Sequence, residues 1–122
     1  MKVLLSIKPE FAHKIFLGIK KYEFRKFIFK HHVSKVIVYA SSPVKMVIGE
    51  FDIEEIIFSD IDSLWKHTKK FSGIEKHKFS KYFRNKKKGY AIKIKSYKKY
   101  ENPLYLKKEF GVLPPQSFVY LK

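Results

Sequence analysis

The chain has 122 residues, 45% of them hydrophobic, which is enough for one domain with a core of its own. It contains no cysteine, which excludes disulfides, thiolate zinc sites and a cysteine nucleophile, and no apolar run approaches the roughly 20 residues that span a bilayer. The formal net charge is +16, from 27 Lys+Arg and 11 Asp+Glu. We therefore expect a single cytoplasmic domain over residues 1–122 that does not associate with membranes and whose basic surface suits an anionic partner.

The excess of lysine has a second explanation. Lys, Ile, Phe, Tyr and Asn are enriched together, as an AT-rich genome would produce without selection for binding. The acids are nevertheless distributed unevenly, because six of the eleven fall in segment 50–62, which holds no basic residue. An acidic element on an otherwise basic body favours a functional basic surface.

The N-terminal third of the chain predicts a strand, a short helix and a second strand. Residues 2–7 are rich in branched side chains, which are typical of a buried strand. Pro9 suits the first turn of a helix and Gly18 suits its left-handed end, with apolar residues at helical spacing between them. Residues 21–27 then alternate between apolar and polar side chains, which predicts a strand.

The middle of the chain predicts two strands and two helices. A strand over 35–40 is followed by a turn at 41–43, and the alternation over 44–58 is typical of a half-solvated strand with one acidic face. A helix is expected from Ser59 to near Phe71. Ser72–Glu75 has the pattern of a capping box, which would begin the next helix.

The last third predicts a strand over 90–95, a short basic helix over 104–110 and a final strand over 117–121. About five or six strands interleaved with about three or four short helices indicate a compact mixed α/β (α+β) domain.

The segment Gly18–Arg25 carries the strongest candidate site. It follows a helix and opens a strand, so Lys21, Glu23 and Arg25 are expected on one face, with Lys20 at the entry turn. Arg can hold a phosphate with two hydrogen bonds, and Glu can accept from the exocyclic amine of a base. A surface strand with cross-strand ion pairs would contain the same residues, so their chemistry leaves both readings open.

Three other segments offer groups suited to nucleic acid. The turn at Ser41 and Ser42 supplies hydroxyls and backbone N–H groups, Gln116 has the donor and acceptor needed to read a base edge, and Lys88 belongs to a basic cluster. A plain turn or a solvated charge run would explain the same residues. The five histidines lack metal-ligand spacing and no phosphate-binding loop is present, so we expect no metal and no cofactor.

Five segments, taken in order, resemble the ASCH domain family. The first two are Ser6–Glu10 and the Gly18–Arg25 pattern Gly-x-Lys-Lys-x-Glu-x-Arg. The other three are Tyr39–Pro43, Val47–Phe51 and Pro114–Phe118. The resemblance covers nearly the whole chain and is typical of a stand-alone domain.

This resemblance implies a fold of the PUA-like superfamily, a small twisted β-barrel flanked by short helices, with a cleft proposed to bind RNA. It implies that Lys20, Glu23 and Arg25 line the cleft, with Ser6 near it. Cationic groups would hold phosphates, while Glu23 and a glutamine would read the edge of an unstacked base. RNA is the expected nucleic acid, and the residues expected to contact it are Lys8, Lys20, Lys21, Glu23, Arg25, Ser41, Ser42, Lys88 and Gln116.

The family leaves the activity open. Some members resemble amidohydrolases that remove an acetyl group from the exocyclic nitrogen of cytidine with a Lys and a Thr three residues later; Lys20 matches the Lys, whereas Glu23 stands at the Thr position. Other members look like ribonucleases. Lys20 and Glu23 are therefore the catalytic candidates if the domain is an enzyme. A third hypothesis is a regulatory protein–protein module whose acidic strand, Glu50–Glu55, contacts a basic partner.

Overall fold

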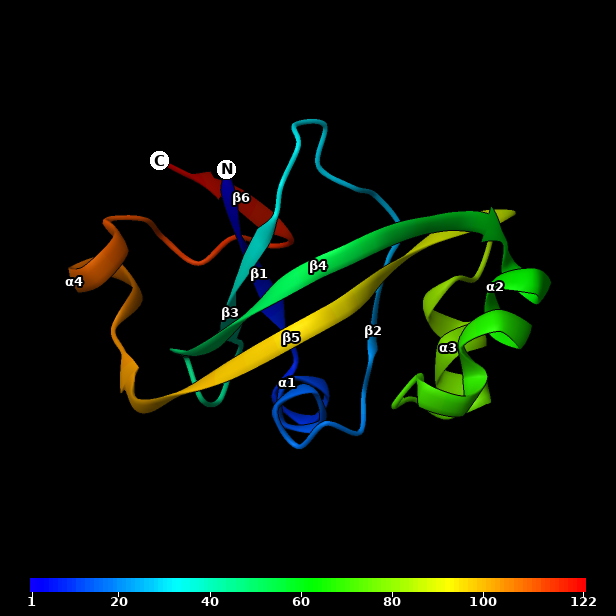
Figure 1. Ribbon diagram of the computed structural model, residues 1–122, viewed down its shortest axis with the longest axis horizontal. Helices are drawn as coiled ribbons and strands as arrows, with labels where there is room; N and C mark the ends of the chain where they lie inside the picture. The colour runs from blue at the N-terminus through cyan, green and yellow to red at the C-terminus, as the bar shows by residue number, and fades with distance from the viewer.

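The computed structural model describes residues 1–122 and contains one six-stranded sheet in the order β2-β5-β4-β3-β1-β6 (Figure 1). The elements are β1 (Lys2–Ile7), α1 (Pro9–Phe16), β2 (Tyr22–Arg25), β3 (Lys35–Ala40), β4 (Met46–Asp60), α2 (Ile61–Thr68), the 3-10 helix η1 (Lys69–Phe71), α3 (Lys76–Tyr82), β5 (Lys88–Leu104), α4 (Leu106–Phe110) and β6 (Phe118–Leu121). Only β1 and β3 pair in parallel. In Figure 1 the long β4–β5 ribbon crosses the molecule, with α2 and α3 at one end and α4 at the other.

The predicted α+β fold class is confirmed, with six strands and four α-helices. The sheet is twisted as expected, but it is not closed into a true barrel. The edge strands β2 and β6 pair only with β5 and β1, respectively, so no ladder joins the two edges.

Local sequence signals place α1 and α2. Pro9 occupies the start of α1, and Gly18 has a φ of 77° just past its end. The N–H of Ile19 donates to the Lys14 carbonyl at 3.0 Å, which is the hydrogen bond of a helix that ends in a left-handed residue. The side chain of Asp60 accepts from the Ser63 N–H at 3.0 Å and caps α2.

Two predicted features differ in the structure. The expected capping box is wrong: Glu75 makes no capping hydrogen bond, and α3 begins at Lys76. Gly73 has a left-handed backbone conformation and turns the chain. The Ser72 hydroxyl instead accepts a hydrogen bond from the Ile74 N–H at 3.5 Å. The strand predicted over 90–95 runs from Lys88 to Leu104 and so extends mainly beyond its predicted end, because tertiary pairing with β4 overrides the polar composition of its second half.

Both faces of the sheet are covered around β1. Val3, Leu5 and Ile7 belong to a cluster that includes α1, whereas Leu4 belongs to a cluster on the other face with Leu106 of α4. Gly49 of β4 lets α1 approach closely, since a Cβ there would lie 2.5 Å from the Phe16 ring. A third cluster joins β2 to α2 and α3 and buries the edge strand. No helix has the length and apolar content needed to cross a bilayer.

Candidate functional site

A cleft of about 910 Å³ opens where α1, β2 and α3 meet the turn after β3 and the loop before β6. Its lining comes from residues 6–11, 20–26, 39–45, 74–82 and 114–116. Seven of the lining side chains are cationic and two are acidic. Segments far apart in the sequence therefore bring an excess of positive charge to one concave surface.

Lys20 lies buried at this cleft, with 2% of its surface exposed. Its Nζ donates to the Ser72 carbonyl at 2.6 Å and lies 4.8 Å from the centre of the Phe24 ring and 5.2 Å from that of Phe11. One strong acceptor and two aromatic faces thus replace most of the water that an ammonium group normally binds.

Burial lowers the pKa of Lys20 from its ordinary value of 10.5 to about 8. The Glu23 carboxylate opposes this effect by favouring the ammonium form, whereas the charges of Lys14 and Arg25 add to it. About half of the Lys20 side chains are consequently neutral near pH 8.

Gly73 allows the loop before α3 to reach Lys20. It has a φ of +65°, and a Cβ at this position would lie 2.5 Å from the Cβ of Lys20. The Gly73 carbonyl also accepts from the Nζ of Lys14 at 3.2 Å. Two lysines therefore hold consecutive carbonyl groups, those of Ser72 and Gly73, and fix the loop against the turn that carries Lys20.

Arg25 and Glu23 form a buried ion pair, with Nη2 of Arg25 3.0 Å from Oε2 of Glu23. The same Nη2 donates to the Ser6 carbonyl at 2.8 Å, and the Ser6 hydroxyl donates to the Pro115 carbonyl at 2.6 Å. The buried Nε of Arg25 has no acceptor. An unmet buried donor costs about 1–3 kcal/mol, so this arrangement is less typical of a stability device than of a binding site.

The rim of the cleft is formed in part by α3. Tyr82 accepts from the Lys26 N–H at 3.2 Å, and burial raises the pKa of its phenol. Lys78 pairs with Glu10 of α1 at 3.4 Å, which joins the two helices at the cleft. Both side chains of this pair are about half exposed, so it contributes little to stability.

The structure brings most of the predicted site residues together. The members of the predicted set that line the cleft are Lys8, Lys20, Glu23, Arg25, Ser41, Ser42 and Gln116. Contact of these residues with nucleic acid remains a prediction.

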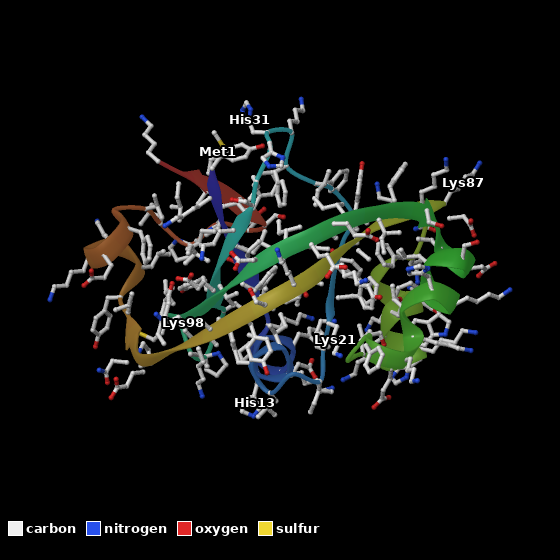
Figure 2. The ribbon with its side chains drawn as sticks, in the orientation of Figure 1. Met1, His13, Lys21, His31, Lys87 and Lys98 are labelled. Carbon is white, nitrogen blue, oxygen red and sulfur yellow. The ribbon has the colours of Figure 1, made fainter.

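Lys21 and Lys88 lie outside the cleft. The ammonium of Lys21 is 4.3 Å from the centre of the Phe71 ring, and that of Lys88 is 5.4 Å from the centre of the Phe58 ring. Figure 2 labels Lys21 near the start of β2 and Lys87, the neighbour of Lys88, at the far end of the β4–β5 ribbon. Lys21 does not share the position of Glu23 and Arg25 because it precedes the buried residues of β2 and remains exposed.

The lining residues that were not predicted from the sequence include Lys26, Tyr39, Lys45, Lys78, Lys81 and Tyr82. A signal existed for three of them, since Lys78, Lys81 and Tyr82 are three and four residues apart and share one face of α3. Lys45 has a φ of 53° in the turn before β4, a conformation that its residue type does not predict.

The acidic face of β4 is already paired within the sheet. Lys35 of β3 lies 2.6 Å from Glu50 and 3.3 Å from Asp52, and Lys93 of β5 lies 2.8 Å from Glu54. These two lysines offset half of the four negative charges of Glu50–Glu55 on which the protein–protein hypothesis rests. No group of three or more His, Asp or Glu side chains is close enough to hold a metal ion.

The ASCH domain family model matches residues 5–113. This chain belongs to the ASCH domain family. The resemblance drawn from its five segments is thereby confirmed.

Several proteins of known name resemble this ASCH domain. The ASCH domain-containing ribonuclease of Zymomonas mobilis is 31% identical over 126 residues, which cover 99% of this chain and 84% of the ribonuclease. The large ribosomal subunit protein uL22 of Ureaplasma parvum serovar 3 is 35% identical over 121 residues, or 98% of this chain. The chain spans only 39% of that protein's length, and 15% of the ATP synthase subunit alpha of the same organism, to which it is 32% identical.

Two solved structures share the fold. The crystal structure of ASCH from Zymomonas mobilis has a TM-score of 0.91 and 30% identity, covering 99% of this chain and 87% of the other. The N-terminal domain of Staphylothermus marinus McrB has a TM-score of 0.53 and 17% identity, covering 92% of this chain and 80% of that one, so this likeness concerns the fold alone.

Proposed function

We propose that this ASCH domain binds single-stranded RNA in the cleft between α1, β2 and α3. The observation that carries the proposal is the concentration of seven cationic side chains in one cleft, among them the buried Lys20 and the Arg25 of the buried pair with Glu23. Polyanions are attracted by such a surface, and a cleft of about 910 Å³ has room for an unstacked nucleotide.

The lining residues divide into two roles. The exposed lysines at the rim, such as Lys8, Lys45 and Lys81, hold phosphates, a contribution that weakens as salt concentration rises. Gln116 and the buried Glu23 face a base, because amide and carboxylate groups pair with base edges. Arg25 is suited to both roles. Its contacts to Glu23 and to Ser6 are both made by Nη2, so its other terminal nitrogen remains for a phosphate or a base.

A salt titration of binding tests this proposal. Fluorescence anisotropy compares single-stranded RNA, duplex RNA and DNA for wild type, for Lys20→Met/Arg25→Gln, and for Lys107→Ala/Lys108→Ala as a control. The control removes the same formal charge from exposed positions of α4, outside the cleft. Circular dichroism establishes that each variant is folded.

We expect the cleft variant to lose at least about tenfold in affinity for single-stranded RNA, the equivalent of about one good hydrogen-bonded contact. The control should lose affinity for all three nucleic acids alike. If folded cleft and control variants lose equally, the charge acts without a specific site and the proposal is refuted.

Cleavage of RNA by attack of its own 2′-hydroxyl, in the same cleft, is a second candidate function. The observation in its favour is a Lys20 amine that is half neutral near pH 8, next to Arg25. In this scheme the neutral amine takes the proton of a ribose 2′-hydroxyl, whose oxygen attacks the adjacent phosphorus. The bond to the 5′-oxygen breaks, the leaving oxygen takes a proton from water, and Arg25 stabilises the charge on the phosphoryl oxygens. The products are a 2′,3′-cyclic phosphate and a 5′-hydroxyl end.

Labelled RNA and N4-acetylcytidine separate the enzymatic alternatives. RNA cleavage by this route predicts cyclic-phosphate ends, a rate that rises with pH until about 8, no cleavage of a 2′-deoxy substrate and no cleavage by folded Lys20→Met. Release of acetate from N4-acetylcytidine, with RNA left intact, would support the amidohydrolase instead. If neither substrate is converted, both enzymatic alternatives are refuted and only the RNA-binding proposal stands.

A further inference from the structure

Phe27 is an exposed aromatic residue with a cation over its ring. It lies two residues beyond the end of β2, and 66% of its surface is exposed. The Nζ of Lys86, in the turn after α3, is 4.3 Å from the ring centre. Single exposed apolar residues are common on protein surfaces, so exposure alone does not indicate a function for Phe27. Its position relative to the cleft is the more informative observation.

The two segments that carry Phe27 and Lys86 also form a wall of the cleft. Lys26 and Tyr82 both line the cleft, and the Nζ of Lys26 lies 4.8 Å from the centre of the Tyr82 ring. Lys26 immediately precedes Phe27, and Lys86 follows Tyr82 by four residues. Phe27 and Lys86 therefore do not line the cleft, but they contact each other and adjoin, along the chain, two residues of its wall.

The charge of this extension fits a polyanion. The chain contains no Asp or Glu in segment 24–49, which includes Phe27, and none in segment 76–100, which includes α3 and Lys86. The residues of these two segments would themselves attract either an acidic protein or a nucleic acid, but an exposed aromatic face next to a phosphate-binding cation is the specific arrangement by which proteins hold single-stranded nucleic acid.

We propose that Phe27 and Lys86 form a second subsite, where a base flanking the nucleotide in the cleft stacks on the Phe27 ring while Lys86 holds its phosphate. This inference rests on the proposed binding of single-stranded RNA in the cleft. The subsite tolerates any base, because every base has a face that stacks on an aromatic ring. It makes affinity depend on the length of the RNA.

The test compares a ribonucleoside 5′-monophosphate, which can fill only the cleft, with an octanucleotide of single-stranded RNA. Phe27→Ala removes the platform, Phe27→Trp retains an aromatic ring, and Lys86→Gln removes the cation. Tyr105→Ala is the matched control, because Tyr105 is also 66% exposed but lies between β5 and α4, outside the cleft. Lys108→Gln is the control for the loss of one exposed lysine.

We expect Phe27→Ala to weaken octanucleotide binding about 5-fold to 150-fold, the range measured when an aromatic stacking residue becomes alanine. Its affinity for the mononucleotide should stay within about twofold of wild type, since the cleft is intact. Phe27→Trp should keep the octanucleotide affinity, and Lys86→Gln should reduce the steepness of the salt dependence by about one phosphate contact.

The failures of the two proposals are distinguishable. If Lys20→Met/Arg25→Gln weakens both ligands but Phe27→Ala weakens neither, the second subsite is refuted and the cleft stands. Equal losses for Phe27→Ala and Tyr105→Ala also refute the subsite, because the effect is then not local. If wild type binds neither ligand, RNA binding itself is refuted.

Discussion

Replacing Lys20 with Met tests the central physical claim about the cleft, the burial of an ammonium group. The fall of the Lys20 pKa from 10.5 to about 8 corresponds to about 3 kcal/mol of unfolding free energy at pH 7, since a tenfold change in proton affinity is worth about 1.4 kcal/mol. The protonated form is disfavoured in the folded state, so the unfolded state binds more protons between about pH 8 and 10.5. The penalty is full below about pH 8 and disappears as the pH rises to 10.5.

The unfolding free energy of wild type should therefore rise relative to that of Lys20→Met, by about 2.5 kcal/mol between pH 7 and 10. Loss of the donor to the Ser72 carbonyl adds an offset that does not depend on pH. Urea unfolding of both proteins at pH 7, 8, 9 and 10 can be followed by the fluorescence of Trp65, which packs against Phe79. A constant difference across this interval would refute the reasoning, as would a Lys20 pKa near 10.5 in a side-chain NMR titration.

Three other predictions concern the cleft, the packing of α1 on β4 and the acidic face of β4. The Glu23 carboxylate raises the pKa of Lys20, so Glu23→Gln should move the NMR titration midpoint of Lys20 below about 8, and an unchanged midpoint would contradict the coupling. Gly49→Ala should destabilise the protein by about 1–3 kcal/mol or more in urea unfolding, since the new Cβ would lie 2.5 Å from the Phe16 ring and 2.6 Å from the Lys98 carbonyl. Gly111→Asn is its control: nothing lies within 4 Å, Asn tolerates the φ of 68°, and a cost above about 1 kcal/mol would show that close contact is not the cause. Glu54→Lys breaks the partly exposed pair with Lys93, so it should cost at most about 1 kcal/mol and leave RNA affinity undiminished; a loss of function here but not in the cleft variants would favour the protein–protein hypothesis.

The parts of the fold that the sequence predicted are those with local causes. Pro9 begins α1 and Gly18 follows its end, because their backbone preferences act within one turn. Asp60 caps α2 through a hydrogen bond to a residue three positions away. The second half of β5 could not be predicted in this way. Its residues alternate poorly, and pairing with β4 shifts register between Val47 and Gly49, between Asp52 and Ile53, and between Ile53 and Glu55.

The site shows the same division. The family pattern drew attention to Lys20, Glu23 and Arg25, but nothing near them in sequence predicts the burial of Lys20. Its acceptor, the Ser72 carbonyl, is 52 residues away, and the approach of that loop depends on Gly73, which was expected only as part of a capping box. The environment that lowers the pKa of Lys20 is thus a tertiary property.

Burial also separates the two explanations of the lysine content. Drift toward AT-rich codons can accumulate lysines where water solvates them, as at the exposed Lys87, because such substitutions change stability very little. It does not explain Lys20, which is 2% exposed and whose charge opposes folding at neutral pH, or Arg25, which is 8% exposed with an unmet buried donor. Stability alone would favour apolar side chains at such positions. A contribution to function that outweighs this cost is the simplest reason for their presence, so these two buried cations point to a selected cleft more strongly than the net charge of +16 does.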